Sequence, residues 1–393
     1  MMPADIEAIQ ADLRAARVGG WLFYDFRGRD PIAQRILQLP AGMRTRRWFY
    51  FVPAKGRPKK LVHRIETQSL AAVPGETLYY SAQKELHGNL KKMLRGANRV
   101  AMQYSPKNEI PYVAMVDAGT IELVRSAGVK VVSSADLVQK YEAVWTPEQL
   151  ASHRRAGAVV DRVIREAFAY AAGCVREKKP VTEYDLKLWI LKEFEAAGVG
   201  ANEGPDVAVN ANASDPHYGP TAEHAAPIRK GDLLLLDVWA KTKAPGSVYY
   251  DVTWTGFLGE SVPEKYAKVF AAVRAARDRA VELIRSSRAK GKPLQGWQVD
   301  EAARAVIEKA GYGKYFFHRT GHSIGESVHG NGANMDGLET HDVRHLIPGT
   351  CTSIEPGIYL ADFGIRSEVN VYIHERDAEV TGAVQTEILP LLE

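Results

Sequence analysis

The second part of the chain carries one order of elements twice, and this order constrains the fold more than any other feature. Two helical patterns precede apolar strand patterns over residues 148–256, and the same order returns over residues 263–374. The residues of the two halves are not alike, so the similarity lies in the order of the elements. It indicates an internal structural duplication in which each half ends in a pair of strands.

The expected helices have recognisable ends. In Thr146-Pro147-Glu148-Gln149, a capping Thr, a Pro at the first helical position and a Gln three residues after the cap mark a helix start. Glycines at positions 198 and 311 close two later helices. We expect helices over residues 148–172, 183–197, 263–286 and 299–310. We expect strands over residues 206–209, 232–240, 249–256, 352–359 and 366–374.

The residues before Thr146 show a different organisation, in which helical patterns alternate with short apolar strands. We expect helices over residues 5–18, 65–72, 84–95 and 112–126, and strands over residues 20–26, 47–52 and 99–102. This alternation is typical of an α/β domain. A chain of 393 residues also exceeds what one core usually serves. We therefore expect two domains, residues 1–145 and 146–393.

Composition narrows the class of protein. The hydrophobic fraction of 46% and the charged fraction of 25% are ordinary for a globular protein. The net charge of +4 is small and the charges alternate in sign, so nucleic acid is not an expected partner. Only two cysteines are present, the start of the chain has no apolar signal segment, and no run of eighteen apolar residues occurs. We expect a cytoplasmic protein that does not cross a membrane.

Two pairs of acidic residues stand in apolar surroundings. Asp237 follows four consecutive leucines, and Asp251 comes fourteen residues later, beyond a turn that contains Pro245-Gly246. Glu355 and Glu368 repeat the arrangement thirteen residues apart. One such acid alone would also fit the exposed end of a strand. Two buried pairs of like charge need a compensating cation.

His322 completes this set of four carboxylates with an imidazole. Such an oxygen-rich set suits Mn²⁺, Co²⁺ or Zn²⁺ better than copper or an iron–sulfur centre. Two divalent ions would roughly neutralise the four anions. Ions about 3.5 to 4 Å apart can share a bridging hydroxide and polarise a scissile carbonyl. The residues therefore predict a dinuclear site that hydrolyses amide bonds.

Five segments around these residues carry a resemblance to a known family. They are Leu-Leu-Asp237-Val, Asp251-Val-Thr-Trp-Thr, Gly-His322-Ser-Ile-Gly-Glu-Ser-Val-His329, Ser-Ile-Glu355-Pro-Gly-Ile-Tyr and Ile-Arg366-Ser-Glu368-Val. In their order and spacing, residues 148–393 resemble the pita-bread metallopeptidases, the family of methionine aminopeptidase, aminopeptidase P and prolidase. The N-terminal domain resembles the creatinase-type domain of aminopeptidase P and prolidase.

The resemblance implies a fold and a substrate. We expect an α+β pita-bread catalytic domain with a pseudo-twofold repeat, a curved antiparallel sheet and helices on its outer face, preceded by a smaller α/β creatinase-type domain. The substrates implied are short Xaa-Pro peptides, from which the N-terminal residue is released. The implied assembly is a homodimer. Two divalent ions per subunit are implied, with Mn²⁺ as the expected ion and Co²⁺ or Zn²⁺ as alternatives.

The resemblance also implies roles for the metal ligands. Asp237 would bind one metal in bidentate fashion, Asp251 and Glu368 would bridge both, and His322 and Glu355 would bind the other. Glu355 would in addition accept a proton from the nucleophile.

Four further residues match positions around the metals in the family. His217 and His329 match two histidines that face the substrate and stabilise or protonate the tetrahedral intermediate. His318 matches a histidine behind the site in aminopeptidase P. We expect Arg366, two residues before a ligand, to hold the carboxylates by charge-assisted hydrogen bonds, with an ordinary surface ion pair as the alternative.

Two departures from the family pattern concern specificity. Prolidases carry an Arg about fourteen residues before the first ligating Glu, where it binds the carboxylate of the dipeptide. That Arg is missing here, although His341 or Arg344 could substitute. A Tyr common three residues before the second ligating Asp is replaced by Val248, with Tyr249 adjacent. Longer Xaa-Pro peptides therefore remain candidate substrates.

Two other functions compete with this hypothesis. A metal-free, creatinase-like C–N hydrolase shares both domains, but such relatives replace the ligating carboxylates. A catalytically inactive peptide- or protein-binding module of the same fold also loses ligands. The complete set of ligand residues in this chain favours the peptidase over both.

Overall fold

The computed structural model describes residues 5–42, 44–202 and 204–392, and the chain divides into two units, Met1–Glu142 and Ala143–Glu393. Among the described residues, no helix combines the length and the apolar character needed to cross a membrane.

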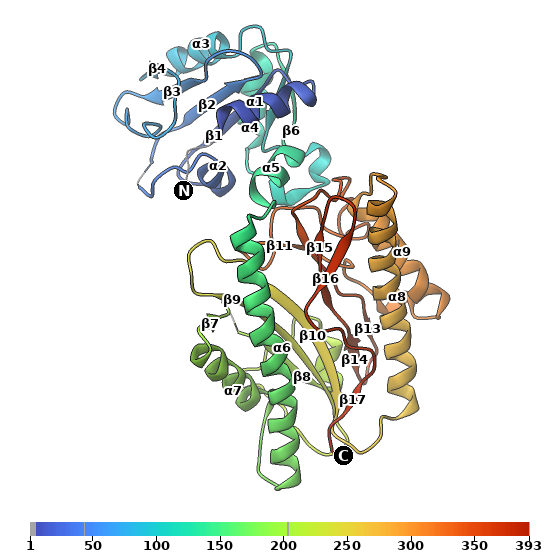
Figure 1. Cartoon of the computed structure of the whole chain (residues 1–393). Coiled ribbons are helices and arrows are strands. Elements are labelled where there is room, and N and C mark those ends of the chain that lie inside the picture. Colours follow the sequence, from blue (N-terminus) through green and yellow to red (C-terminus); the bar gives the residue numbers. More distant parts are fainter. Residues whose placement is uncertain (1–4, 43, 203, 393) are drawn as a thin grey trace. The chain divides into compact units, whose positions relative to one another are not determined.

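The first unit is built on one mixed sheet of six strands, ordered β4-β3-β2-β1-β5-β6 (Figure 1, blue to cyan). The strands are β1 (Gly20–Asp25), β2 (Trp48–Pro53), β3 (Lys59–His63), β4 (Glu76–Tyr80), β5 (Arg99–Met102) and β6 (Lys130–Ser133). The helices are α1 (Ile6–Ala15), α2 (Pro31–Ile36), α3 (Gln83–Met93), α4 (Ala118–Ser126) and α5 (Ala135–Glu142). Two apolar clusters fill this unit, and each contains side chains of β1 and β2. The expected α/β organisation is confirmed.

Two predicted helices of this unit are wrong in detail. Residues 65–72 form successive turns with bonds from residue i+3 to residue i, and the Glu66 carboxylate accepts the backbone N–H groups of Thr45 and Arg46 at 2.9 and 3.1 Å. This bonding fixes an irregular crossover between the parallel strands β3 and β4. The segment 112–126 is interrupted because the Asp117 side chain caps a new helix, α4, by accepting the N–H of Thr120 at 2.8 Å. Helices α2 and α5 and strands β3, β4 and β6 escaped prediction.

The first half of the second unit follows the expected order. Helices α6 (Pro147–Arg176) and α7 (Glu183–Ala196) precede strands β7 (Val199–Gly200), β8 (Asp206–Val209), β9 (Leu233–Thr242) and β10 (Tyr250–Phe257). The Thr146 hydroxyl accepts the Gln149 N–H at 3.2 Å and the Gln149 side chain accepts the Thr146 N–H at 3.0 Å. This reciprocal pair is the predicted helix start.

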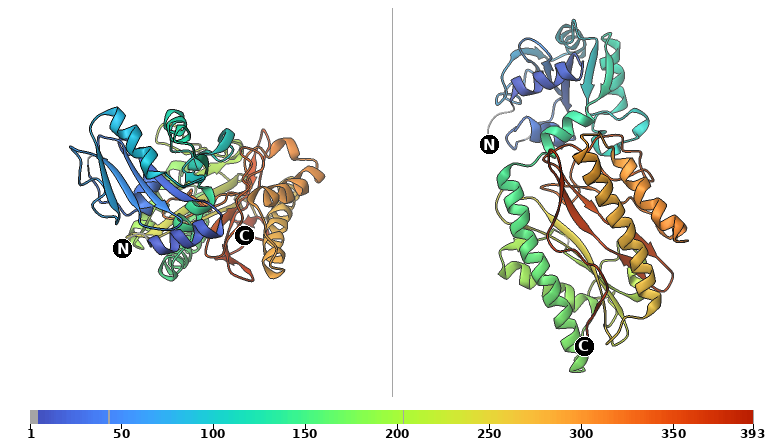
Figure 2. Two further views of the ribbon diagram at one scale, coloured as in Figure 1. Left: turned by 90° about the horizontal axis from the view of Figure 1, so that it is seen from above. Right: turned by 45° about the vertical axis from the view of Figure 1, so that its right-hand side comes forward.

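The second half repeats the order. Helices α8 (Glu264–Ala289) and α9 (Gly296–Lys309) precede β11 (Ser323–Ile324), β12 (Cys351–Ile354), β13 (Gly357–Tyr359), β14 (Gly364–Arg366), β15 (Val369–Ile373), β16 (Ala378–Thr381) and β17 (Leu389–Pro390). Helices α8 and α9 lie side by side (Figure 2, right, orange). The strands predicted over 352–359 and 366–374 are each interrupted, and the breaks fall at Glu355-Pro356 and at Ser367-Glu368.

Helices cover one face of each strand group. Side chains of α6 and α7 share an apolar cluster with Leu234, Leu236 and Val252 of β9 and β10. Side chains of α8 and α9 share another with Ile354 and Val369. Figure 1 shows the corresponding pairing of green helices with yellow strands and of orange helices with red strands. The opposite face of β9 and β10 carries Asp237, Asp251 and Thr253 beside apolar side chains such as Leu235.

Candidate active site

Asp237 and Asp251 lie on neighbouring antiparallel strands and on the same face of the sheet. In the pairing of β9 with β10, Asp237 is opposite Thr253 and Asp251 is opposite Trp239, so the two acids are diagonal neighbours. Side chains alternate between faces along a strand. Leu236 consequently enters the core with α6 while Asp237 points away from it. The alternation thus anchors the strand by its apolar side chains and presents the acids together.

Glu355 and Glu368 lie where strands end rather than within them. Glu355 follows β12 and Glu368 precedes β15. Ile354 and Val369 are register partners, so the two glutamates flank the same end of this pairing. The Thr253 hydroxyl of β10 donates to Glu368 Oε2 at 2.8 Å, which links the second strand pair to the first.

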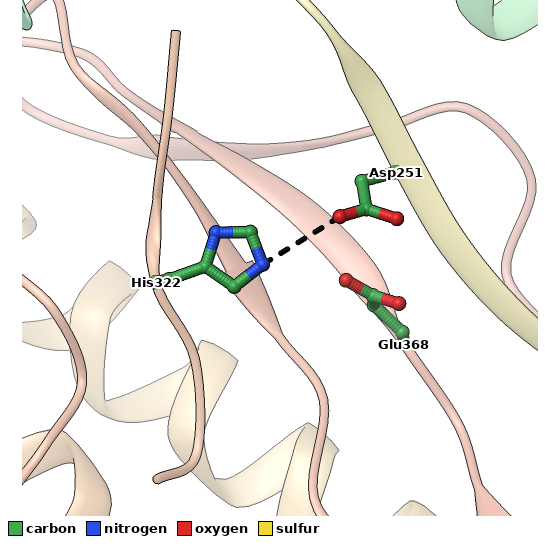
Figure 3. A group of neighbouring side chains, drawn as sticks. All are labelled: Asp251, His322 and Glu368. Carbon is green, nitrogen blue, oxygen red and sulfur yellow. Dashed lines mark ion pairs between the residues drawn. The ribbon is translucent and has the colours of Figure 1, made fainter. Parts of the chain in front are cut away.

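His322 brings a nitrogen to these acids. Its Nε2 lies 3.5 Å from Asp251 Oδ2 and 3.4 Å from Glu355 Oε1 (Figure 3 draws the first of these contacts). Its Nδ1 lies 3.1 Å from the carbonyl oxygen of Ser323, which can only accept a hydrogen bond. Nδ1 therefore carries the hydrogen, and the lone pair of Nε2 faces the carboxylates. Metal-binding histidines are oriented in this way.

The carboxylate oxygens left without partners fit a divalent cation. Asp251 Oδ1 and Glu368 Oε1 are buried and have no hydrogen-bond partner among the described residues. Ligand atoms of Asp251, His322 and Glu368 all lie within 4.8 Å of one another. Burial and the neighbouring acids raise the pKa of Asp251 and of Glu368 well above the ordinary carboxyl range. A divalent cation would satisfy the unpaired oxygens and keep both groups ionised.

Arg366 is a buried cation at the back of this group, 3% exposed, so a surface ion pair does not describe it. Its Nη2 donates to Asp237 Oδ2 at 2.5 Å, its Nε to Thr253 Oγ1 at 3.0 Å and its Nη1 to the Tyr359 hydroxyl at 2.9 Å. His318 Nε2 lies 2.7 Å from the same hydroxyl. A continuous chain of hydrogen bonds therefore runs from Asp237 through Arg366 and Tyr359 to His318.

The residues predicted as metal ligands, and those predicted to act or give support around them, line one cavity of about 670 Å³. They are Asp237, Asp251, His322, Glu355, Glu368, His217, His318, His329 and Arg366. The ring of His329 packs edge-on against His322, with centroids 4.3 Å apart. His322 and burial lower the pKa of His329 to about 3. Burial likewise lowers the pKa of His318 to about 3, so both rings are neutral at pH 7.

Comparison with known proteins assigns the family. Residues 151–375, more than half of the chain, match the model of metallopeptidase family M24. This chain belongs to metallopeptidase family M24. It is therefore an enzyme that cleaves peptides, and its family implies divalent metal ions, which the buried ligand set fits.

Two relatives of this M24 peptidase are informative in sequence. The chain is 29% identical over 336 residues to a probable dipeptidase PepE of Mycobacterium bovis, covering 83% of this chain and 81% of that one. It is 31% identical over 237 residues to an Xaa-Pro dipeptidase of Lactobacillus helveticus, covering 60% and 58%.

Solved structures support the fold of the M24 peptidase. The dipeptidase PepE of Mycobacterium ulcerans superposes with a TM-score of 0.71 at 25% identity, covering 98% of this chain and 96% of that one. A prolidase of Thermococcus sibiricus superposes with a TM-score of 0.64 at 23% identity, covering 99% of this chain and 100% of that one. At this identity the similarity is evidence for the fold alone. The expected pita-bread architecture is confirmed.

The residues considered as substitutes for the missing Arg are not at the site. Arg344 is buried in an ion pair with Asp342 at 2.6 Å. His341 is exposed, and its ring lies tilted against Trp297 with the centroids 5.0 Å apart. Neither is among the described residues that line the cavity. The cavity instead contains Arg319, whose charge contributes to the lowered pKa values of His318, His322 and His329.

Tyr249 lies in the wall of the cavity, although the expected tyrosine position is held by Val248. Its backbone N–H donates to the carbonyl of Gly325 at 2.9 Å, and its ring lies 4.9 Å from the Lys241 ammonium. Val248 is fully buried. A tyrosine is therefore present in the wall, one residue later in the chain.

Glu183 holds the segment that carries His217, and the sequence analysis did not identify it. Its fully buried carboxylate accepts the N–H groups of Val209 and Ala226 at 2.7 Å each and the hydroxyl of Tyr218 at 2.6 Å. These contacts tie both ends of the segment that carries His217. Nothing in the sequence marks this residue, because a Glu in the first turn of a helix is common on surfaces.

Asp206 is a further acid of the cavity that sequence reasoning missed. In the pairing of β8 with β9 it lies directly opposite Asp237. Burial, followed by the charge of Asp237, raises its pKa to about 7. Only the register between the two strands reveals this proximity, and register is not visible in one strand.

Proposed function

We propose that this M24 peptidase is a dinuclear Xaa-Pro exopeptidase that binds two divalent ions through the residues Asp237, Asp251, His322, Glu355 and Glu368. The observation that carries the proposal is the convergence of four carboxylates and one imidazole around buried oxygens that have no protein partner. Asp251 and Glu368, which own those oxygens, are the proposed bridging ligands. Asp237 would hold one ion, and His322 with Glu355 the other. Mn²⁺ is the proposed native ion.

Divalent ions bound there would lower the pKa of a water molecule and polarise the scissile carbonyl. Glu355, which lies at the cavity and is partly exposed, is placed to accept the proton that the attacking water releases. His217 and His329 would donate hydrogen bonds to the carbonyl oxygen as it gains charge. Arg366 would hold Asp237 in place through its charge-assisted hydrogen bond.

The preference for proline is supported by the named relatives, which include Xaa-Pro dipeptidases. A dipeptide presents a free carboxylate close to the scissile bond, and binding it requires a cation in the cavity. We propose that Arg319 supplies this cation, in place of the Arg that prolidases carry about fourteen residues before the first ligating Glu. The enzyme would then favour dipeptides over longer Xaa-Pro peptides.

We further propose that the first unit is the creatinase-type domain and that the enzyme acts as a homodimer in the cytoplasm. The match to nearly the full length of the Mycobacterium ulcerans dipeptidase supports the first of these points. The other two come from the family resemblance.

The test is hydrolysis of Ala-Pro and of Ala-Pro-Ala by metal-free enzyme reloaded with Mn²⁺, with Asp251→Asn as the inactive control. We expect both activities to depend on the metal and on Asp251. Cleavage of Ala-Pro with little cleavage of Ala-Pro-Ala supports the dipeptidase, and the reverse result would assign aminopeptidase P behaviour. Absence of both activities, with other dipeptides cleaved, would contradict the proposed function.

A further inference from the structure

We infer that Asp206 binds the free α-ammonium group of the substrate and so restricts cleavage to the first peptide bond. This inference rests on the proposed function and adds a specificity residue to it. An exopeptidase must distinguish an N-terminal ammonium from an internal amide, and a carboxylate not consumed by metal binding is the group suited to that task.

Strand register places Asp206 where such a group is needed. β8 and β9 pair antiparallel with Asp206 opposite Asp237, and both side chains line the cavity. Asp237 belongs to the metal ligands, whereas Asp206 is one strand further from β10. On its other side, Asp206 Oδ1 approaches Gly219, on the segment that carries His217, so that a Cβ added to Gly219 would lie 3.3 Å from this oxygen. The carboxylate thus lies between a proposed ligand and a proposed catalytic segment.

The two other acids of the cavity that are not proposed metal ligands, Glu339 and Glu326, have identified partners. Glu339 accepts the backbone N–H of Arg319 at 2.9 Å, and Glu326 lies 3.5 Å from the Gln149 amide. For the Asp206 carboxylate, the described part of the chain offers neither a hydrogen bond nor an ion pair within 4.0 Å. The charges of Lys187 and Arg366 act on this carboxylate only from a greater distance. Asp206 is therefore available for a cation from outside the protein.

The cavity carries an acid and a base on different sides, an arrangement that matches the two charges of a zwitterionic dipeptide. Asp206 lies at the β8–β9 side, next to Asp237. Arg319 belongs to the second half of the unit, where its charge contributes to the lowered pKa values of His318, His322 and His329. An ammonium at Asp206 and a carboxylate at Arg319 would place the peptide bond of Xaa-Pro between them, at the carboxylates that bind metal. An ammonium at this position also favours the ionised form of Asp206.

The experiment compares two substrates that differ only in the ammonium group, Ala-Pro and propanoyl-proline. Wild type, Asp206→Asn and Asp206→Ser are assayed as metal-loaded full-length enzymes, with the exposed surface change Asp362→Asn as a matched control. We expect both Asp206 variants to lose about 10- to 100-fold in kcat/KM for Ala-Pro, the range of a hydrogen bond to a charged group. Their kcat/KM for propanoyl-proline should stay within about threefold of wild type, and Asp362→Asn should leave both values unchanged.

Several results would overturn the inference. An equal loss on both substrates, or a loss of bound metal measured by elemental analysis, would assign Asp206 to the metal centre. Wild-type enzyme could instead prefer Lys-Pro over norleucyl-proline, and Asp206→Asn could abolish this preference while kcat/KM for Ala-Pro stays unchanged. That result would show that Asp206 binds the side chain of the first residue. Wild-type enzyme that cleaves Ala-Pro, with variants equal to it, refutes this inference alone. Wild-type enzyme that cleaves no Xaa-Pro peptide refutes the proposed function instead.

Discussion

The substitution Tyr359→Phe removes one oxygen atom from the core of the site and tests whether the hydrogen-bond chain behind the carboxylates stabilises the fold. The hydroxyl accepts from Arg366 Nη1 at 2.9 Å and lies 2.7 Å from His318 Nε2, in a side chain that is 4% exposed. The ring itself is unchanged, so packing is preserved. A hydrogen bond to a charged group contributes about 1.5 to 3 kcal/mol and a neutral one about 0.5 to 1.5 kcal/mol. We therefore expect the free energy of unfolding to fall by about 2 to 4 kcal/mol.

The assay is urea unfolding of the full-length chain, with Tyr50→Phe as the control. The hydroxyl of Tyr50 makes one neutral hydrogen bond, to the Pro74 carbonyl at 2.9 Å, and its ring is also fully buried. The control should lose about 0.5 to 1.5 kcal/mol. A loss for Tyr359→Phe no larger than that of the control would contradict this prediction, because it would mean that Arg366 and His318 find other partners at little cost.

Two further predictions concern stability. Burial raises the pKa of Asp30 to about 7, so the stability that the protonated carboxyl contributes is fully present below about pH 4 and is lost as the pH rises through 7. Asp30→Asn keeps the cap of α2, and its stability relative to wild type should rise between pH 4 and pH 8, by at most about 4 kcal/mol. The measurement is thermal unfolding at several pH values, with the exposed cap variant Asp5→Asn as the control. An equal rise in stability for Asp5→Asn would contradict the prediction. A Cβ added at Gly321 would lie 2.0 Å from the Ser353 carbonyl oxygen, so Gly321→Ala must displace β12. We expect this displacement to lower both the melting temperature and the affinity for metal. Gly173→Ala, which meets nothing within 4 Å in α6, should be neutral or stabilising, and equal melting temperatures for the two variants would show that the contact at Gly321 is easily relieved.

The sequence was sufficient for the residues whose chemistry conflicts with their surroundings. A carboxylate after four leucines at Asp237, or in the apolar stretch around Glu355, is costly unless it has a partner, so such positions stand out in one chain. Helix ends were also accessible, because the capping side chains of Thr146 and Gln149 act within four residues of each other. These features depend on local sequence.

Features that depend on register or on long-range contacts were not accessible. Asp206 meets Asp237 because β8 pairs with β9 in one register out of several that its short apolar pattern would allow. Tyr359 comes within hydrogen-bond distance of Arg366 because the β13–β14 hairpin places Gly357 opposite Arg366. The breaks at Glu355 and Glu368 were missed because apolar residues on both sides continue the strand pattern across them.

The number of divalent ions that one chain binds decides whether the site is dinuclear. Metal-free enzyme is titrated with Mn²⁺ by isothermal calorimetry, and the bound metal is counted by elemental analysis after desalting. We expect two ions per chain for wild type, and fewer than one for Asp251→Asn, because Asp251 is the proposed ligand of both ions. A wild-type enzyme that binds a single ion, or an Asp251→Asn variant that retains two, would contradict the dinuclear site.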